Sequence, residues 1–199
     1  MLQTKTSDIS DQINNGEPVK LAFHYNTKEI NKFLNSIFVK ILSKNDLDYL
    51  QGMVETILRE MIINAVKANS KRVFFKMKSL DIYNEDEYNT GMEEFKSFLL
   101  SEESRLADEL KENGYRVELC LIKNNDGFRI MVRNNSPLLP FENDRIQARM
   151  EKARAYNDFG EIYMDIADDS EGEGLGIPLT VLFLKNSGIG DKSFNIKSD

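Results

Sequence analysis

The sequence predicts an α+β fold built around one main sheet, with a mixed α/β arrangement as the alternative. Three observations predict it. The chain has 199 residues, which suits one domain with a real core and is hardly enough for two. Its hydrophobic content of 41% and charged content of 30% are typical of a folded chain. Helical apolar spacing and strand-like alternation both occur along it.

The first part of the chain is expected to contain a flexible arm and four regular elements. Residues 1–16 are polar, lack periodicity and end at Gly16, which indicates a loose arm. Thr27 is a suitable N-cap for the first helix. The four elements are, in order, a strand at 18–26, a helix at 27–42, a helix at about 45–69 and a strand at 71–78.

The rest of the chain alternates helical segments with a hairpin. The turn "NNDG" at 124–127 separates two alternating runs and predicts the hairpin. Residues 158–173 hold seven acids and no Lys or Arg, so this segment is expected to be a mobile loop. The predicted elements are helices within 80–114, strands at 115–123 and 128–134, helices at 141–157 and 174–186, and a short strand at 192–199.

Composition narrows the classes of function. The net charge of −7 and pI of about 5 argue against general nucleic-acid binding, which requires a basic surface. A single cysteine, Cys120, allows no internal disulfide and favours a reducing compartment, so a cytoplasmic location is expected. Its place in an alternating strand favours a small buried apolar residue over a reactive thiol. No apolar run reaches membrane-spanning length, and the start lacks a signal-peptide pattern.

A polar stripe runs along the second predicted helix. Glu60, Asn64 and Lys67 are spaced i, i+4 and i+7, so they share one side of a helix that is otherwise apolar here. The stripe can be a solvated face with a Glu–Lys pair, which contributes only a few tenths of a kcal/mol. It can also be a site for phosphoryl chemistry, with a carboxylate to orient a nucleophile, an amide oxygen for Mg²⁺ and a lysine for phosphate.

Two further stretches are rich in turn-forming residues. "EGEGLGIPLTVLFLKNSG", residues 171–188, places three alternating glycines before a helix, where free backbone N–H groups and the helix dipole attract anions. By itself it is as compatible with a flexible link as with a phosphate loop. "VRNNSPLLP", residues 132–140, follows a hairpin strand and by itself is ordinary turn chemistry.

These three features, in this order, resemble the GHKL ATP-binding superfamily, which includes histidine-kinase catalytic domains, anti-sigma-factor serine kinases and gyrase. "EMIINAVKAN" resembles the family's N box, "VRNNSPLLP" its first glycine box and "EGEGLGIPL" its second. The resemblance spans about residues 50–198. It implies a Bergerat fold, which is a two-layer α/β sandwich whose mixed, mainly antiparallel sheet is covered on one face by helices. Residues 17–199 would then form a single ATP-binding domain, with a helical insertion at about 80–114 and an ATP lid at about 141–173.

The resemblance also assigns roles to individual residues. Glu60 would polarise a water or an acceptor group, Asn64 would hold Mg²⁺, and Lys67 would approach the phosphates. The remaining nucleotide-binding residues implied by the family are Asn134, Ser136, Leu138, Gly172, Gly174, Leu175 and Gly176. The implied cofactors are ATP and Mg²⁺, with ADP as a further ligand.

The first glycine box departs from the family pattern. Asn134 stands where the family has an adenine-binding Asp, and Ser136 and Leu138 stand at usual glycine positions. An Asn oxygen can accept from the adenine amine, but without the strength of a carboxylate, so weaker adenine affinity and poorer discrimination against guanine are expected. The only histidine, His24, lies on a predicted strand and is interpreted as structural or surface-exposed.

Three functions remain in competition. The first is a kinase-type domain that binds Mg-ATP and passes the γ-phosphoryl to a histidine on another domain or chain. The second is an anti-sigma-type serine kinase. The third is a degenerate nucleotide-binding module that regulates a partner without catalysis, which the altered first glycine box favours and the intact Glu60–Asn64–Lys67 stripe opposes.

Overall fold

The computed structural model describes residues 6–125, 127–167 and 175–197, and the chain forms two compact units. Unit 1 comprises residues 1–136 and unit 2 residues 137–199, and each is described by itself. The mixture of helices with one three-stranded antiparallel sheet confirms the α+β class. That the two units form a single ATP-binding domain stays a prediction.

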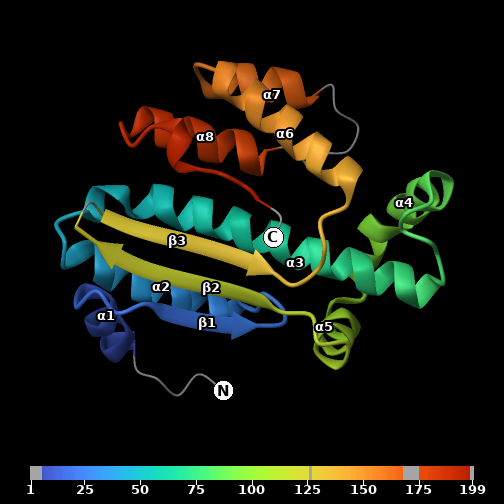
Figure 1. Ribbon diagram of the computed structural model, residues 1–199, viewed down its shortest axis with the longest axis horizontal. Helices are drawn as coiled ribbons and strands as arrows, with labels where there is room; N and C mark the ends of the chain where they lie inside the picture. Colours follow the sequence, from blue (N-terminus) through green and yellow to red (C-terminus); the bar gives the residue numbers. More distant parts are fainter. Residues whose placement is uncertain (1–5, 126, 168–174, 198–199) are drawn as a thin grey trace. The chain divides into compact units, whose positions relative to one another are not determined.

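Unit 1 contains the sheet (Figure 1). Its elements are α1 (Thr6–Asn14), β1 (Val19–Phe23), α2 (Lys28–Ser43), the 3₁₀ turn η1 (Asp48–Leu50), α3 (Gln51–Lys78), α4 (Glu85–Ser101), α5 (Glu103–Glu112), β2 (Val117–Asn124) and β3 (Gly127–Asn134). The expected first strand and first helix are confirmed as β1 and α2, and Thr27 caps α2 by accepting from the N–H of Ile30 at 3.3 Å.

The strands lie in the order β1–β2–β3, and both pairings are antiparallel. The predicted hairpin is confirmed as β2 and β3. The parallel component of the expected mixed sheet is absent from the described strands. Two of the expected strands are wrong: residues 71–78 continue α3, and 192–199 contribute the 3₁₀ turn η2 (Asp191–Ser193) but no strand among the described positions.

The strand expected at 71–78 fails because a short apolar run fits a buried helix as well as a strand. In the structure Val73, Phe74 and Phe75 are all buried, so this end of α3 is enclosed on several sides rather than on alternating positions. The helix ends at Ser79, whose φ of 55° lies in the left-handed region and whose N–H bonds back to the carbonyl of Lys76.

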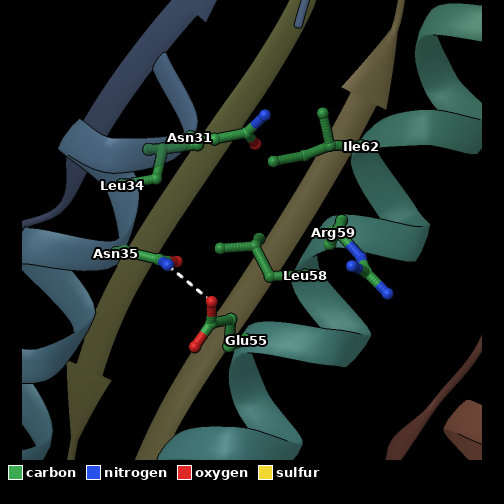
Figure 2. A pocket seen from close by; sticks show the side chains of 7 residues that line it. All are labelled: Asn31, Leu34, Asn35, Glu55, Leu58, Arg59 and Ile62. Atoms are coloured by element: carbon green, nitrogen blue, oxygen red, sulfur yellow. Dashed lines mark hydrogen bonds between the residues drawn. The ribbon is translucent and has the colours of Figure 1, made fainter. Parts of the chain in front are cut away.

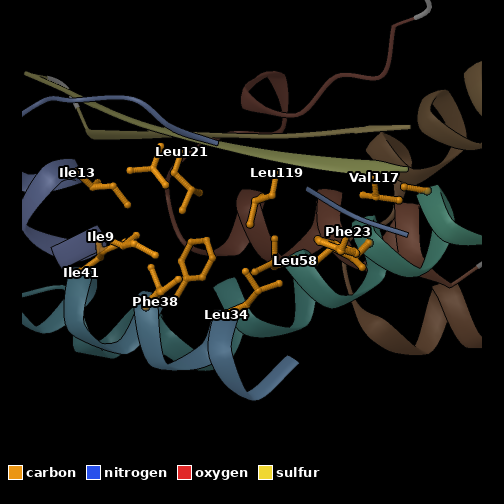
Figure 3. Packing of buried hydrophobic residues seen from close by; sticks show 14 of the residues in the cluster. Ile9, Ile13, Phe23, Leu34, Phe38, Ile41, Leu58, Val117, Leu119 and Leu121 are labelled. Carbon is orange, nitrogen blue, oxygen red and sulfur yellow. The ribbon is translucent and has the colours of Figure 1, made fainter. Parts of the chain in front are cut away.

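The main core of unit 1 lies between one face of the sheet and the helices α1, α2 and α3 (Figure 3). Val117, Leu119 and Leu121 alternate along β2 toward these helices. The loose arm expected at residues 1–16 is wrong for residues 6–14, which form α1. Ile9 and Ile13 of this helix are buried against α2 and the sheet. Two apolar residues four positions apart are enough to dock a short helix, although they give little signal in a polar sequence.

A second cluster packs the C-terminal half of α3 against α4 and α5. The ring centroids of Phe74 and Phe95 lie 5.4 Å apart, and those of Phe75 and Tyr88 lie 5.7 Å apart. Leu106 on α5 is fully buried against Val73. The helices expected within 80–114 are therefore confirmed, while their status as an insertion into a family fold stays a prediction.

Unit 2 consists of α6 (Pro140–Ala155), α7 (Phe159–Ala167), α8 (Gly176–Asn186) and η2. The helices expected at 141–157 and 174–186 are confirmed as α6 and α8. The expected mobile loop at 158–173 is corrected over its first part, which forms α7. The carboxylate of Asp158 accepts a hydrogen bond from the N–H of Glu161, and the carboxylate of Glu161 accepts one from the N–H of Asn157. These acids therefore cap the N-terminus of α7.

The helices of the described ranges are all too short or too polar to cross a membrane.

Candidate functional site

Helix α3 carries a buried face and, opposite it, the predicted polar stripe. Leu58, Ile62 and Val66 are buried against the sheet and α2. At 100° per residue, Glu60 and Asn64 point to the other side of the helix. The structure thus brings Glu60, Asn64 and Lys67 together on one side of a single helix, as the spacing predicts.

The three residues of the stripe differ in exposure. Asn64 is exposed, and Lys67 is half-buried. The side chain of Glu60 is 24% exposed and lies 3.8 Å from the guanidinium of Arg59. An ion pair at this distance near the surface contributes little to stability, so it leaves the carboxylate available for another partner.

The donor chemistry of the stripe fits a Mg²⁺ ion that shares its coordination with phosphates. The amide of Asn64 and the carboxylate of Glu60 one turn earlier are hard oxygen donors. In the described residues no cluster of three or more His, Cys, Asp or Glu could hold a metal. Mg²⁺ bound with a nucleotide usually takes one or two protein ligands plus phosphates and water, so a larger cluster is not required.

A network of amides lies where β3 ends against α3. Asn134 Nδ2 donates to Ser136 Oγ at 2.6 Å and lies 3.5 Å from Asn69 Oδ1. Asn69 is fully buried and donates from Nδ2 to the carbonyl of Arg116 at 3.1 Å. Because the NH₂ of Asn134 faces these partners, its Oδ1 is the atom presented on the other side of the amide.

A second asparagine, Asn135, joins the end of β3 to the segment that precedes β2. Asn135 accepts from the N–H of Arg116 at 2.7 Å and donates to the carbonyl of Gly114 at 2.9 Å. Close by, Nδ1 of His24 lies 2.7 Å from the carbonyl oxygen of Tyr115, a distance that places the ring proton on Nδ1. This contact between two chain segments agrees with the structural role expected for His24.

Two residues of this hydrogen-bond network, Asn69 and Arg116, are not among the site residues predicted from the sequence. Asn69 follows Leu58, Ile62 and Val66 at helical spacing, so it lies on the buried face of α3. A polar residue in an apolar stripe is the one signal that could have identified it, because a buried amide must find hydrogen-bond partners.

The other predicted site residues lie in unit 2. Leu138 is half-buried and precedes α6. Leu175 is the N-cap residue of α8, and Gly176 is its buried first residue, whose carbonyl accepts from Thr180 Oγ1 at 2.8 Å. Gly172 and Gly174 lie outside the described residues.

A hollow between α2 and α3 in unit 1 contains none of the predicted residues (Figure 2). Its rim holds Asn35, whose amide donates to Glu55 at 2.6 Å, and Arg59 lines it from α3. Its volume of about 170 Å³ is small beside the ~300–1,000 Å³ of typical ligand pockets. The hollow is therefore not a candidate nucleotide site.

Comparison with known proteins leaves the family open. No family model matches the chain. It is 26% identical over 179 residues to an uncharacterized protein of Treponema pallidum (strain Nichols). The alignment covers 90% of this chain and 35% of the relative, so the chain spans about a third of that protein's length. No solved structure matches the chain.

Proposed function

We propose that this chain is a histidine kinase-like ATP-binding domain that binds Mg-ATP through the stripe on α3 and supports phosphoryl transfer to a histidine on another domain or chain. The observation that carries the proposal is the arrangement of Glu60, Asn64 and Lys67. A carboxylate, an amide and an ammonium lie on the side of α3 turned away from its buried face. The resemblance of "EMIINAVKAN" to the N box supplies the chemistry.

Each residue of the stripe has a defined task under this proposal. Glu60 orients the attacking group by accepting its proton, Asn64 ligates the metal through Oδ1, and Lys67 neutralises phosphate charge. Mg²⁺ supplies charge neutralisation across the phosphate oxygens when it is bound. Because phosphoryl transfer depends mostly on positioning and electrostatics, a rigid helix is a suitable support for these groups.

The adenine end is assigned to Asn134 and Ser136. Hydrogen bonds from the NH₂ of Asn134 to Ser136 and toward buried Asn69 leave its Oδ1 as the acceptor for an exocyclic amine. The resemblance assigns the phosphates to Gly172, Gly174, Leu175 and Gly176, and assigns the base pocket to Leu138.

A degenerate module without catalysis is the second candidate, because Asn134 replaces an acid and weakens the contact with adenine. The serine-kinase alternative predicts the same ligand and a different acceptor. Both kinase functions therefore predict magnesium-dependent ATP binding, and only acceptor labelling separates them.

Titration of the full chain with ATP, ADP and GTP, with and without Mg²⁺, tests the proposal. Asn64→Ala is expected to abolish the magnesium-dependent part of ATP binding. Asn89→Ala, which removes another exposed helical asparagine on α4, is the matched control and should bind ATP like the parent chain. If the parent chain bound no nucleotide, or if both variants bound equally, the stripe would not be a nucleotide site. Radiolabelled ATP with candidate acceptors then distinguishes transfer from binding alone.

A further inference from the structure

Among the described residues of unit 1, no helix covers the face of the sheet opposite α1, α2 and α3, and the middle of this face is apolar. In Figure 1, α2 and α3 lie behind the three strands, and the other face of the sheet turns toward the viewer. We call this the outer face. Its residues alternate with those that face the core: Lys20 and Ala22 on β1, Glu118, Cys120 and Ile122 on β2, and Arg129, Met131 and Arg133 on β3.

The apolar middle of the outer face is unusual for a solvent-facing sheet. Cys120, which is buried, pairs with Met131 across β2 and β3, and Ile122 is the next residue of β2 on the same face. Met131 and Ile122 are half-buried. A strand with one solvated face normally alternates apolar and polar residues, whereas a near-continuous apolar run is typical of strands covered on both faces. Apart from Glu118, the run "VELCLI" in β2 is of the second kind, so the outer face is suited to a cover.

The residues that surround the apolar middle of the outer face are mostly basic, although the protein has a net negative charge. Lys20, Arg129 and Arg133 are exposed around the apolar middle. The single acid, Glu118, is hydrogen-bonded by Arg116 at 2.7 Å. That bond and the charge of Arg116 lower the pKa of Glu118, with smaller contributions from Lys20 and Arg133. The outer face therefore carries a net positive charge on a chain whose net charge is −7.

Helix α7 has properties complementary to those of the outer face, because it exposes apolar side chains and carries acids. Phe159, Tyr163 and Met164 are exposed on its surface, while Ile162 is buried within unit 2. Its N-terminus carries Asp158 and Glu161, and residues 158–173 include no Lys or Arg. An acidic helix with an apolar surface matches a basic face with an apolar middle in both respects.

We propose that the outer face of one copy of this chain binds α7 of a second copy. A contact between two outer faces is less favourable than a contact between the outer face and α7, because Lys20, Arg129 and Arg133 would meet like charges. Three strands ~4.8 Å apart give a face about 14 Å wide, and nine helical residues cover about 14 Å of length. A contact of this size is smaller than a standard stable interface, so the association is weak and sensitive to salt.

Thiol cross-linking between two differently substituted chains detects such a weak contact. Both chains carry Cys120→Ala, which removes the single native thiol. One chain adds Ala22→Cys on the outer face, and the other adds Met164→Cys on α7; both parent residues are exposed. The control partner adds Leu100→Cys instead, at a position on α4 that is 90% exposed.

Docking predicts that the Ala22→Cys chain forms the mixed disulfide with the Met164→Cys chain about tenfold faster than with the Leu100→Cys chain, since docking raises the local thiol concentration. Adding Arg129→Glu and Lys20→Glu to the outer face, or raising the salt concentration, is expected to bring the two rates together. Equal rates for both partners, or no mixed dimer with either, would overturn the proposal and leave the outer face to a different partner.

Discussion

The side-chain amide of Asn134, the last residue of β3, lies 3.5 Å from Oδ1 of Asn69 on α3. Asn69 is fully buried, and its own NH₂ donates to the carbonyl of Arg116 just before β2. One buried side chain thus joins the ends of two strands to the helix that carries Glu60, Asn64 and Lys67. The amide network at Asn134 therefore lies on the buried face of α3, and the stripe lies on the opposite side of the same helix.

Removal of the Asn69 side chain is expected to destabilise the fold. Asn69→Ala leaves the carbonyl of Arg116 with only the backbone N–H of Asn135, at 3.4 Å, as a donor, and the loss of one such hydrogen bond costs about 0.5–1.5 kcal/mol. Urea denaturation measures the loss. Asn64→Ala on the exposed side of the same helix should change the free energy of unfolding by less than about 0.5 kcal/mol. Equal losses in both variants would mean that the Asn69 bonds contribute nothing specific.

Asn134→Asp is expected to strengthen ATP binding and to increase the preference for ATP over GTP. A carboxylate accepts a stronger, charge-assisted bond from the adenine amine than an amide oxygen does. Isothermal titration with both nucleotides measures the two affinities. Ser136→Ala, which removes the hydroxyl that accepts from Asn134, should lower ATP affinity instead. Unchanged ATP and GTP affinities in Asn134→Asp would show that residue 134 does not contact the base.

Gly91→Ala is expected to loosen the packing of α4 on α3. A Cβ at Gly91 would lie 2.5 Å from Cζ of the Phe75 ring, which is buried and stacked on Tyr88. Overpacking of this kind costs about 1–3 kcal/mol. Gly52→Ala is the matched control, because a Cβ there meets nothing within 4 Å and the substitution should stabilise α3 by about 0.5–1 kcal/mol. Thermal melts that move in opposite directions would bear this out.

Ile13→Ala is expected to unfold the chain more easily, although Ile13 lies in a polar segment. Its side chain is fully buried among residues of α2 and the sheet, and removing a buried Ile side chain costs about 2–5 kcal/mol. Gln12→Ala, at an exposed neighbour, should leave the free energy of unfolding unchanged. If α1 did not dock, both substitutions would be neutral in denaturant titrations.

The stability of the fold is expected to fall in alkaline solution partly through Tyr25. Burial first, and then the negative charge of Glu103, raise the pKa of Tyr25 above its ordinary 10.0. Above pH 10 the unfolded chain therefore loses this proton before the folded chain does, and the free energy of unfolding decreases until the folded form also ionises. Tyr25→Phe should show a weaker decrease over that range. The ultraviolet absorbance of tyrosinate in both proteins provides the comparison.

Elements with a clear period were predictable from the sequence, and elements with mixed signals were not. The hairpin of β2 and β3 followed from alternation around "NNDG", and α2 followed from its apolar spacing behind Thr27. The end of α3 has the apolar pattern of a strand because Val73, Phe74 and Phe75 are buried together, and the pattern does not distinguish the two structures. The acidic sequence of α7 resembles a loop, because nothing in the sequence shows that Asp158 and Glu161 cap a helix.

The sequence by itself determined the stripe of Glu60, Asn64 and Lys67, because helical spacing alone puts i, i+4 and i+7 on one side. It also determined that the sheet has an alternating core face, since a strand turns successive side chains to opposite sides. Only the tertiary structure decided that Asn69 meets Asn134 and Arg116, and that Ile9 and Ile13 dock a polar segment onto the core. Those contacts join residues far apart in the chain, and such pairings depend on packing that no local pattern records.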